Sequence, residues 1–200
     1  MFITFEGIDG SGKTTQVELL KLYFENLGKT VITIRDPGST LISEKIRNIL
    51  LDSNNLSISP QSETLLFTAA RAQIVHEVIK PSLEKNKIVI CDRFIDSTSA
   101  YQGYGRDMNL VNIGYLNKFA MQGVHPNFTF LIDISTQEST NRLNKSSLDR
   151  MELAGNDFYE KVRAGYIDLV KNFPERIFRI DGSLPIEDIH SKIINIINSK

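Results

Sequence analysis

Short apolar runs recur along the chain, separated by longer stretches in which apolar residues return every three or four positions. The runs lie at residues 2–6, 30–34, 88–91, 128–134 and 177–180. They are rich in β-branched and aromatic residues, which favour strands, and the run at 88–91 is apolar throughout, as in a strand buried on both faces. The pattern therefore predicts five strands.

The intervening stretches show helical periodicity. Apolar residues lie three or four positions apart between 14 and 27, and Gly28 stands where a helix commonly ends. Pro60 suits the first position of a further helix, which Pro81 should end or kink near Lys80. The pattern predicts helices at 14–27, around 46–50, and at 60–80, 110–122, 136–143, 157–172 and 185–198.

Strands that alternate with helices form a parallel sheet through right-handed crossovers. The length of 200 residues fits one domain, and no linker rich in Pro, Gly and Ser divides it. We therefore expect one α/β domain over residues 1–200, a five-stranded parallel sheet flanked by helices on both faces. The polar segment 140–156 has little apolar pattern and is expected to be mobile.

Composition and charge narrow the class of protein. The net charge of −1 gives no positive field that would attract nucleic acid or an anionic membrane. The single cysteine, Cys91, excludes an intramolecular disulfide and a multi-thiolate zinc site. No apolar run approaches the roughly 18 residues that span a bilayer, and the N-terminus lacks the basic start of a signal peptide. We expect a cytoplasmic protein without membrane or nucleic-acid partners.

The strongest motif lies between the first predicted strand and the first predicted helix. Residues 7–14 read GIDGSGKT and match the phosphate-binding pattern G-x-x-x-x-G-K-[ST], or P-loop, so a P-loop NTPase type of fold is predicted. The glycines let successive N–H groups face one concavity, and the following helix adds its positive end. Lys13 supplies a cation between the β- and γ-phosphates of ATP, and Thr14 an oxygen for Mg²⁺. The residues expected at the ATP phosphates are Gly7, Ile8, Asp9, Gly10, Ser11, Gly12, Lys13, Thr14 and Thr15.

Charged residues near this loop point to a second substrate. Phosphates would repel Asp9, so it should face the metal shell or a hydroxyl of the second substrate; the alternative is an Asp that satisfies loop N–H groups. Arg35 ends the second predicted strand, and Asp92 and Arg93 follow the third. Ligands of an open parallel sheet lie beyond the carboxyl ends of its strands, so these side chains should converge near the P-loop. Asp92 is then placed to hold Mg²⁺ through water.

P-loop proteins fall into two broad classes, switches and motors on one side and small-molecule kinases on the other. A GTPase switch carries an Asn-Lys-x-Asp motif, and the Asn-Lys pairs at 86–87, 117–118 and 144–145 lack the Asp. Phe67 and Arg71 lie four positions apart on one helix face, where a ring and a guanidinium can stack a flat base and donate to its edge. The alternative for this pair is a core Phe with an Arg that extends to solvent.

Several segments, taken in order, resemble the thymidylate kinase family over nearly the whole chain. They are FEGIDGSGKTT at 5–15, RDPGST at 35–40, LFTAAR at 66–71, DRF at 92–94, STSAYQG at 97–103 and LDRME at 148–152. The resemblance implies transfer of the γ-phosphate of ATP to dTMP, with Mg²⁺, in dTTP biosynthesis, and family members are usually homodimers. The alternatives are another nucleoside-monophosphate or deoxynucleoside kinase, and a non-catalytic nucleotide-binding regulatory module.

The resemblance also implies roles for single residues. Phe67 would stack on thymine, Arg71 would donate to its O4, and Tyr101 would crowd the 2′ position of the sugar. The expected dTMP-binding residues are Asp9, Arg35, Phe67, Arg71, Arg93, Thr98, Tyr101 and Gln102. The expected metal ligands are Thr14 and Asp92, with Asp9 as a further candidate.

The chain departs from the usual family pattern at two places. Asp36 and Ser39 stand where the family usually has the first and last residues of Glu-Pro-Gly-Gly. The variable P-loop positions carry no basic residue, so the chain resembles the branch of the family in which the lid supplies that charge. The resemblance identifies the mobile segment 140–156 as this lid. Of its cations Arg142, Lys145 and Arg150, we prefer Arg150 at the transferring phosphate, then Arg142. The expected catalytic residues are Lys13, Asp9, Arg93, Arg150 and Arg142.

Overall fold

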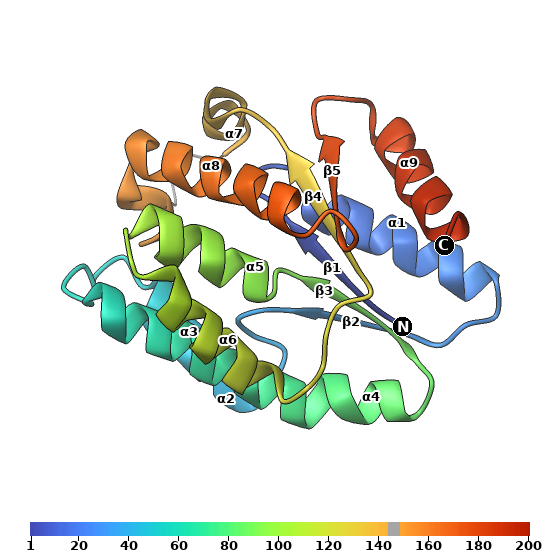
Figure 1. The fold of residues 1–200 in the computed structure, drawn as a ribbon, viewed down its shortest axis with the longest axis horizontal. Coiled ribbons are helices and arrows are strands. Elements are labelled where there is room, and N and C mark those ends of the chain that lie inside the picture. Colours follow the sequence, from blue (N-terminus) through green and yellow to red (C-terminus); the bar gives the residue numbers. More distant parts are fainter. Residues whose placement is uncertain (144–148) are drawn as a thin grey trace.

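The fold is taken from a computed structural model that describes residues 1–143 and 149–200. These residues form a five-stranded parallel sheet in the order β2-β3-β1-β4-β5 (Figure 1), so the predicted α/β architecture is confirmed. The strands are β1 (Phe2–Glu6), β2 (Val31–Arg35), β3 (Ile88–Asp92), β4 (Phe128–Asp133) and β5 (Ile177–Asp181). Each lies within one or two residues of a predicted strand, because buried strands carry the densest apolar runs.

The helices fill the intervals between the strands. They are α1 (Lys13–Asn26), α2 (Leu41–Leu51), α3 (Pro60–Ile74), α4 (Lys80–Glu84), α5 (Ile95–Thr98), α6 (Leu110–Met121), α7 (Thr136–Arg142), α8 (Asn156–Asn172) and α9 (Ile186–Asn198). Two π-helical segments, η1 (Val75–Ile79) and η2 (Ser99–Gly105), and a short 3₁₀ segment, η3 (Glu152–Ala154), continue or join them. None of the described helices is long and apolar enough to span a membrane.

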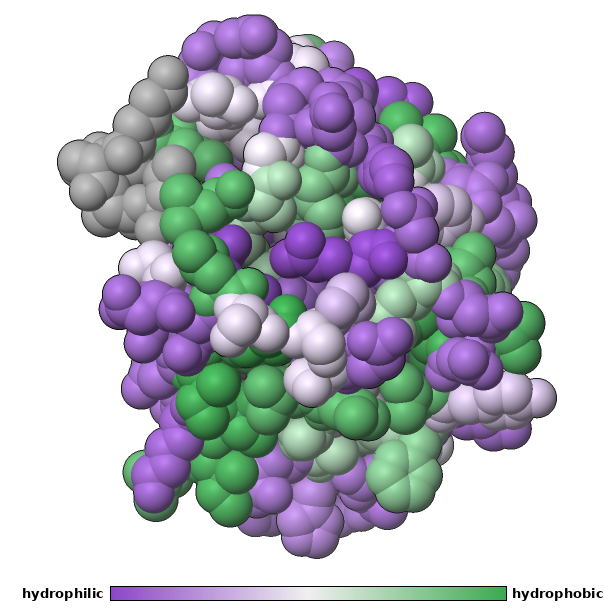
Figure 2. Space-filling model, turned by 90° about the vertical axis from the view of Figure 1, so that its left-hand side faces the viewer, coloured by the Kyte–Doolittle hydropathy of each residue, from purple (hydrophilic) through white to green (hydrophobic). Residues whose placement is uncertain are grey.

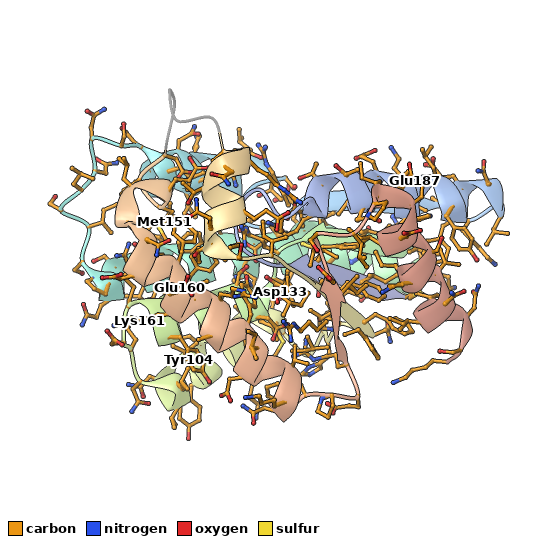
Figure 3. All side chains as sticks on the ribbon, turned by 90° about the horizontal axis from the view of Figure 1, so that it is seen from above. Tyr104, Asp133, Met151, Glu160, Lys161 and Glu187 are labelled. Carbon is orange, nitrogen blue, oxygen red and sulfur yellow. The ribbon has the colours of Figure 1, made fainter. Side chains whose placement is uncertain are left out.

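Helices cover both faces of the sheet. On one face α1 and α9 bury Leu20 and Ile193 against Phe5 and Phe130. On the other face η2 and α8 pack over β4 and β5, while α3, η1 and α6 pack over β1, β2 and β3. In Figure 3, seen from above, Glu160 and Lys161 mark α8, and Asp133 marks the end of β4. Arg35 and Asp92, the last residues of β2 and β3, line a cavity at the carboxyl edge of the sheet.

The helix that begins at Pro60 differs from its predicted end. Pro81 does not end it near Lys80, because the helix continues through η1 and α4 to Glu84. Pro81 lies in the first turn of α4, where the missing N–H of proline is tolerated. The wider π-helical turn of η1 precedes it and takes up the irregularity in the hydrogen-bond ladder.

The helical stretch formed by α5 and η2 lies where the pattern predicts no element. Its sequence is rich in Ser and Gly and has little helical apolar period. Close packing stabilises it instead: a Cβ placed on Gly105 would lie 2.6 Å from Phe158 Cε2 and 2.9 Å from Val162 Cγ2. Gly105 therefore allows α8 to approach this segment closely, and tertiary contact overrides the weak local pattern.

Candidate active site

The P-loop connects β1 to α1 as predicted. Gly7, Gly10 and Gly12 adopt positive φ values of 137°, 74° and 96°, and a Cβ on Gly7 would lie 2.4 Å from the carbonyl oxygen of Ile132. Only glycine fits such a close backbone approach. The loop thus leads directly into the N-terminus of α1, where unpaired N–H groups favour an anion.

Lys13, the first residue of α1, lies over this loop. Its Nζ donates to the carbonyl oxygens of Gly7 at 3.1 Å and Ile8 at 3.0 Å. Burial, together with the positive charge of Arg93, lowers the pKa of Lys13 to about 8. The amine is thus held at the loop by carbonyl contacts that a phosphate oxygen can replace.

Thr14 and Asp92 are brought together from two elements. The Thr14 hydroxyl donates to Asp92 Oδ2 at 3.0 Å, joining the first turn of α1 to the end of β3. A hydroxyl and a carboxylate suit Mg²⁺, which binds oxygen and commonly takes few protein ligands besides phosphate oxygens and water. The described residues contain no group of three or more His, Cys, Asp and Glu that could hold a metal alone. This donor set therefore fits Mg²⁺ bound together with a nucleotide.

Two cavities meet beyond the ends of the strands. The larger, about 820 Å³, is lined by the P-loop and by Arg35, Asp92 and Arg142. The smaller is lined by residues of α3, α5 and η2, among them Phe67, Arg71, Thr98, Tyr101 and Gln102. Four charged residues, Asp9, Asp36, Arg47 and Arg93, line both cavities. In Figure 2 strongly hydrophilic residues cross the middle of the molecular face, and hydrophobic residues gather below them.

Asp9 and Arg93 form an ion pair at this junction. Arg93 Nη2 donates to Asp9 Oδ1 at 2.5 Å, and the hydroxyls of Tyr101 and Tyr159 donate to Asp9 Oδ2 at 3.3 and 3.1 Å. Burial raises the pKa of Asp9, but the charges of Arg93 and Lys13 outweigh it and hold the pKa at about 2. Asp9 is therefore an anion on the wall that both cavities share. None of its described partners is a loop N–H.

Arg71 is buried rather than extended to solvent. Its Nε donates to Asp36 Oδ2 at 2.5 Å, and its Nη1 donates to Thr98 Oγ1 at 2.7 Å and Asn117 Oδ1 at 3.1 Å. Phe67, one turn earlier on α3, is half-buried and lines the same pocket. The ring and the guanidinium thus share one cavity, as their spacing predicts.

Arg35 lies apart from these two residues. Its side chain is about half exposed, pairs with Glu44, and lines the larger cavity only. The geometry therefore groups Arg35 with the P-loop residues and does not bring it to Phe67. Gln102 lines the small pocket, but its amide donates to Glu63 at 2.9 Å.

The two described lid cations lie in different surroundings. Arg150 is buried, donates to Glu63 Oε2 at 2.7 Å and to the Leu50 carbonyl at 2.6 Å, and is outside the described linings of both cavities. Arg142 lines the larger cavity and donates to the Gly10 carbonyl at 3.2 Å. Arg142 therefore lies at the P-loop and Arg150 does not. Lys145 lies outside the described residues, as do residues 144–148 of the predicted lid as a whole.

The sequence pattern misses several residues of the site. Arg47 comes from α2 and Tyr159 from α8, and both face inward from helices whose period identifies only the buried apolar face. Asp36 follows Arg35 at the end of β2, so its strand-end position was a usable signal. Asn117 carries no local signal, because its partner Arg71 is far away in the sequence.

A P-loop opening into a charged cavity, with an adjoining pocket walled by an aromatic ring and a guanidinium, defines a kinase that phosphorylates a nucleotide or nucleoside. The family model described as thymidylate kinase matches residues 5–193. The thymidylate kinase of Thermosipho africanus is 49% identical over 197 residues, which cover 98% of this chain and 97% of that protein. The thymidylate kinase of Thermoanaerobacter sp. is 46% identical over 196 residues, which cover 98% of this chain and 96% of that protein. The chain belongs to the thymidylate kinase family.

A solved structure gives the same result. The crystal structure of thymidylate kinase from Ehrlichia chaffeensis is similar with a TM-score of 0.81 and 40% sequence identity, over 99% of this chain and 98% of that chain. The resemblance drawn from the sequence is thereby confirmed, and with it the prediction of a P-loop enzyme of the kinase class.

Proposed function

We propose that this chain transfers the γ-phosphate of ATP to dTMP, giving ADP and dTDP for dTTP biosynthesis in the cytoplasm. The observation that carries the proposal is the wall shared by the two cavities, where four charged residues face both the P-loop side and the aromatic pocket. A donor and an acceptor bound on either side would meet along this wall. We propose residues 1–200 as one domain with a lid at 140–156.

The ATP side is supported by the P-loop geometry. The loop N–H groups and Lys13 would hold the phosphates of ATP. Thr14 and Asp92 would hold Mg²⁺, which neutralises phosphate charge when bound; Asp9, already held by Arg93, is a further candidate ligand. Arg35, on the same side, would contact phosphate rather than the base.

The dTMP side is supported by the smaller pocket. Phe67 would stack on the base, Arg71 would donate to its edge, and Thr98 and Gln102 complete the wall. Tyr101 donates to Asp9 and would lie against the sugar. Asp9, which lines the same pocket, would accept a hydrogen bond from the sugar 3′-hydroxyl.

The chemical step needs no protein nucleophile. A phosphate oxygen of dTMP attacks the γ-phosphorus, and the bond to the bridging oxygen of ADP breaks. Arg93, on the shared wall, and Arg142, at the P-loop, would stabilise the negative charge between the two anionic substrates. Arg150 is proposed to position Glu63 and the start of α3 instead.

A coupled ADP-release assay tests the proposal directly. The acceptors are dTMP, dUMP, dCMP, AMP and thymidine, each with ATP and Mg²⁺. We expect dTMP to be among the best acceptors. Preference for another monophosphate or for thymidine would favour a different kinase, and ATP binding without transfer to any acceptor would favour a regulatory module.

We also propose that the chain forms a homodimer. Large apolar side chains are exposed on three neighbouring helices, α2, α3 and α6. Large exposed apolar side chains gathered on neighbouring helices are typical of a protein interface. The exposed residues are Leu41, Ile42, Ile49, Leu65, Leu110, Val111, Tyr115 and Phe119.

A further inference from the structure

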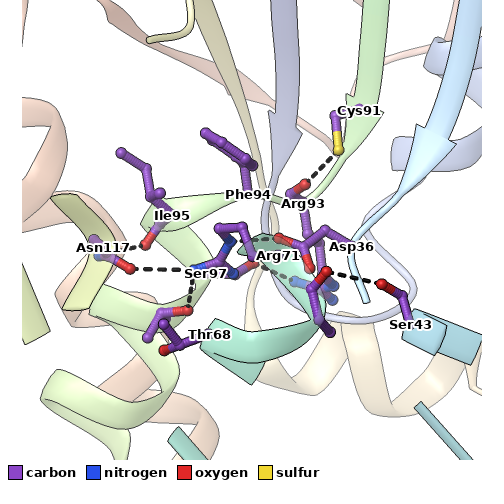
Figure 4. Close-up of polar contacts among 12 residues, drawn as sticks. Asp36, Ser43, Thr68, Arg71, Cys91, Arg93, Phe94, Ile95, Ser97 and Asn117 are labelled. Atoms are coloured by element: carbon purple, nitrogen blue, oxygen red, sulfur yellow. Dashed lines mark hydrogen bonds and ion pairs between the residues drawn. The ribbon is translucent and has the colours of Figure 1, made fainter. Parts of the chain in front are cut away.

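The guanidinium of Arg71 is held by acceptors from three separate parts of the chain. Asp36, after β2, accepts from Nε; Thr98, in α5, and Asn117, in α6, both accept from Nη1. Figure 4 shows Arg71 lying between Asp36 on one side and Asn117 on the other. Since the guanidinium is planar, contacts at Nε and Nη1 together fix both its position and its plane.

One nitrogen of Arg71 is left for a ligand. No described residue accepts a hydrogen bond from Nη2, although the Arg71 side chain is only 1% exposed and lines the small pocket. A guanidinium has donors and no acceptor. Nη2 can therefore donate a hydrogen bond to a carbonyl oxygen, whereas another N–H donor in the same place would be repelled.

Asn117 is itself held in one orientation. Its Nδ2 donates to the Ile95 carbonyl and to Ser99 Oγ, both at 3.2 Å, so its Oδ1 must face Arg71. The position of the Arg71 guanidinium therefore depends, through the Asn117 amide, on the positions of α5 and η2.

Asp36 makes the arrangement costly. Its side chain is fully buried, and its second carboxylate oxygen, Oδ1, has no partner among the described residues. Burial raises the pKa of Asp36 above its usual value, despite the opposing charge of the adjacent Arg71. A buried ion pair with an unpartnered oxygen contributes little net stability, so its position calls for another explanation.

We propose that Asn117 and Asp36 are positioning residues that aim Nη2 of Arg71 at the C4 carbonyl of a bound thymine or uracil base, and thereby exclude cytosine, whose 4-amino group is a donor. The inference rests on the proposed function. It adds two residues, neither of which needs to touch the substrate, as determinants of base selectivity.

Dissociation constants of dTMP, dUMP and dCMP test the inference, with dCMP measured by competitive displacement at high concentration. In Asn117→Ala we expect dTMP and dUMP to bind about tenfold more weakly, the loss of roughly one hydrogen bond, while dCMP changes by less than about threefold. The affinity for ATP should stay within about twofold. Asn112→Ala is the matched control, because Asn112 is an exposed residue of the same helix.

An equal loss for all three nucleotides would overturn the inference, because it would indicate general damage to the pocket, and so would no change at all. Asp36→Asn and Asp36→Glu supply a second test. Asp36→Asn removes the charge and should reduce the preference for dTMP over dCMP. Asp36→Glu keeps the charge and should retain more of that preference. Wild-type protein that fails to bind dTMP would instead overturn the proposed function.

Discussion

Arg93 connects the two cavities through contacts of one side chain. It has a positive φ of 69°, and its Nη1 donates to the Gly7 carbonyl at 2.8 Å while Nη2 pairs with Asp9. Its guanidinium also lies 5.1 Å from the centre of the Tyr101 ring. A residue in this uncommon backbone conformation is retained where its surroundings require it. The surroundings here are the P-loop on one side and the small pocket on the other.

Lys13 gives the first prediction at this scale. We expect Lys13→Ala to lower kcat by at least about a hundredfold, because a cation positioned at the developing negative charge is lost. The fold should persist, since α1 keeps its buried apolar face. Steady-state kinetics and a circular dichroism melt measure the two effects. Lys29→Ala, at an exposed lysine, is the control, and unchanged turnover in Lys13→Ala would remove Lys13 from the mechanism.

Glu6 gives a prediction about pH. This buried carboxyl accepts from the backbone N–H of Phe94 and from the hydroxyls of Ser97 and Tyr166. Burial, and then the charge of Asp96, raise its pKa to about 7. A carboxyl whose pKa is raised on folding binds more protons in the native state, so its contribution to stability is present at low pH and is lost as pH rises through 7.

The isosteric variant Glu6→Gln cannot titrate and isolates this contribution. We expect the melting temperature of the wild type to fall more between pH 5 and pH 8 than that of Glu6→Gln. Thermal melts of both proteins at several pH values provide the comparison. Parallel pH dependence in the two proteins would contradict the raised pKa.

At the scale of elements, periodicity predicts those parts of the fold whose burial is continuous along the chain. The strands and α1, α6, α8 and α9 fall close to their predicted ranges because their own apolar residues decide them. The stretch formed by α5 and η2 does not, because its helix depends on contact with α8. The same reason limits prediction of the site: Arg93 has a strand-end position, whereas Asn117 and Arg47 gain their roles only from partners that folding brings near.

The packing of η2 against α8 can be tested at its glycine. We expect Gly105→Ala to destabilise the protein by about 1–3 kcal/mol, because the new methyl group would overlap Phe158 and Val162. Urea unfolding measures the change. Gly114→Ala in α6 is the matched control, since no described atom lies within 4 Å of its Cβ position, and there we expect a gain of roughly 0.5–1 kcal/mol. Equal effects at both sites would contradict the close approach.

The segments on either side of residues 144–148 make a contrasting pair. We expect Arg142→Ala, at the end of α7, to lower kcat about tenfold or more with little change in the KM for dTMP, as loss of a transition-state contact should. We expect Arg150→Ala to lower stability by about 1–3 kcal/mol through its buried contacts with Glu63 and Leu50. Kinetics and urea unfolding of both variants measure these effects. A loss of kcat confined to Arg150→Ala would restore the order expected from the sequence.

At the scale of the whole molecule, the exposed apolar side chains of α2, α3 and α6 are the basis for the proposed homodimer. Phe119 on α6 is 79% exposed, the highest value among the exposed large apolar residues described. We expect Phe119→Glu to shift the protein from dimer to monomer, because a charge replaces apolar surface at the proposed interface. Sedimentation velocity over a range of concentrations measures this. Phe173→Glu, at an exposed ring outside α2, α3 and α6, should leave the assembly unchanged.

The two faces of helix α6 differ in their contacts. Its outer face carries Phe119 and Tyr115, and its inner face carries Asn117, which contacts Arg71 in the nucleotide pocket. If a second copy settles the position of this helix, the energies of assembly and of nucleotide binding are linked, and linkage acts equally in both directions. Dilution that dissociates the dimer would then lower the affinity for dTMP, and saturation with dTMP would favour the dimer.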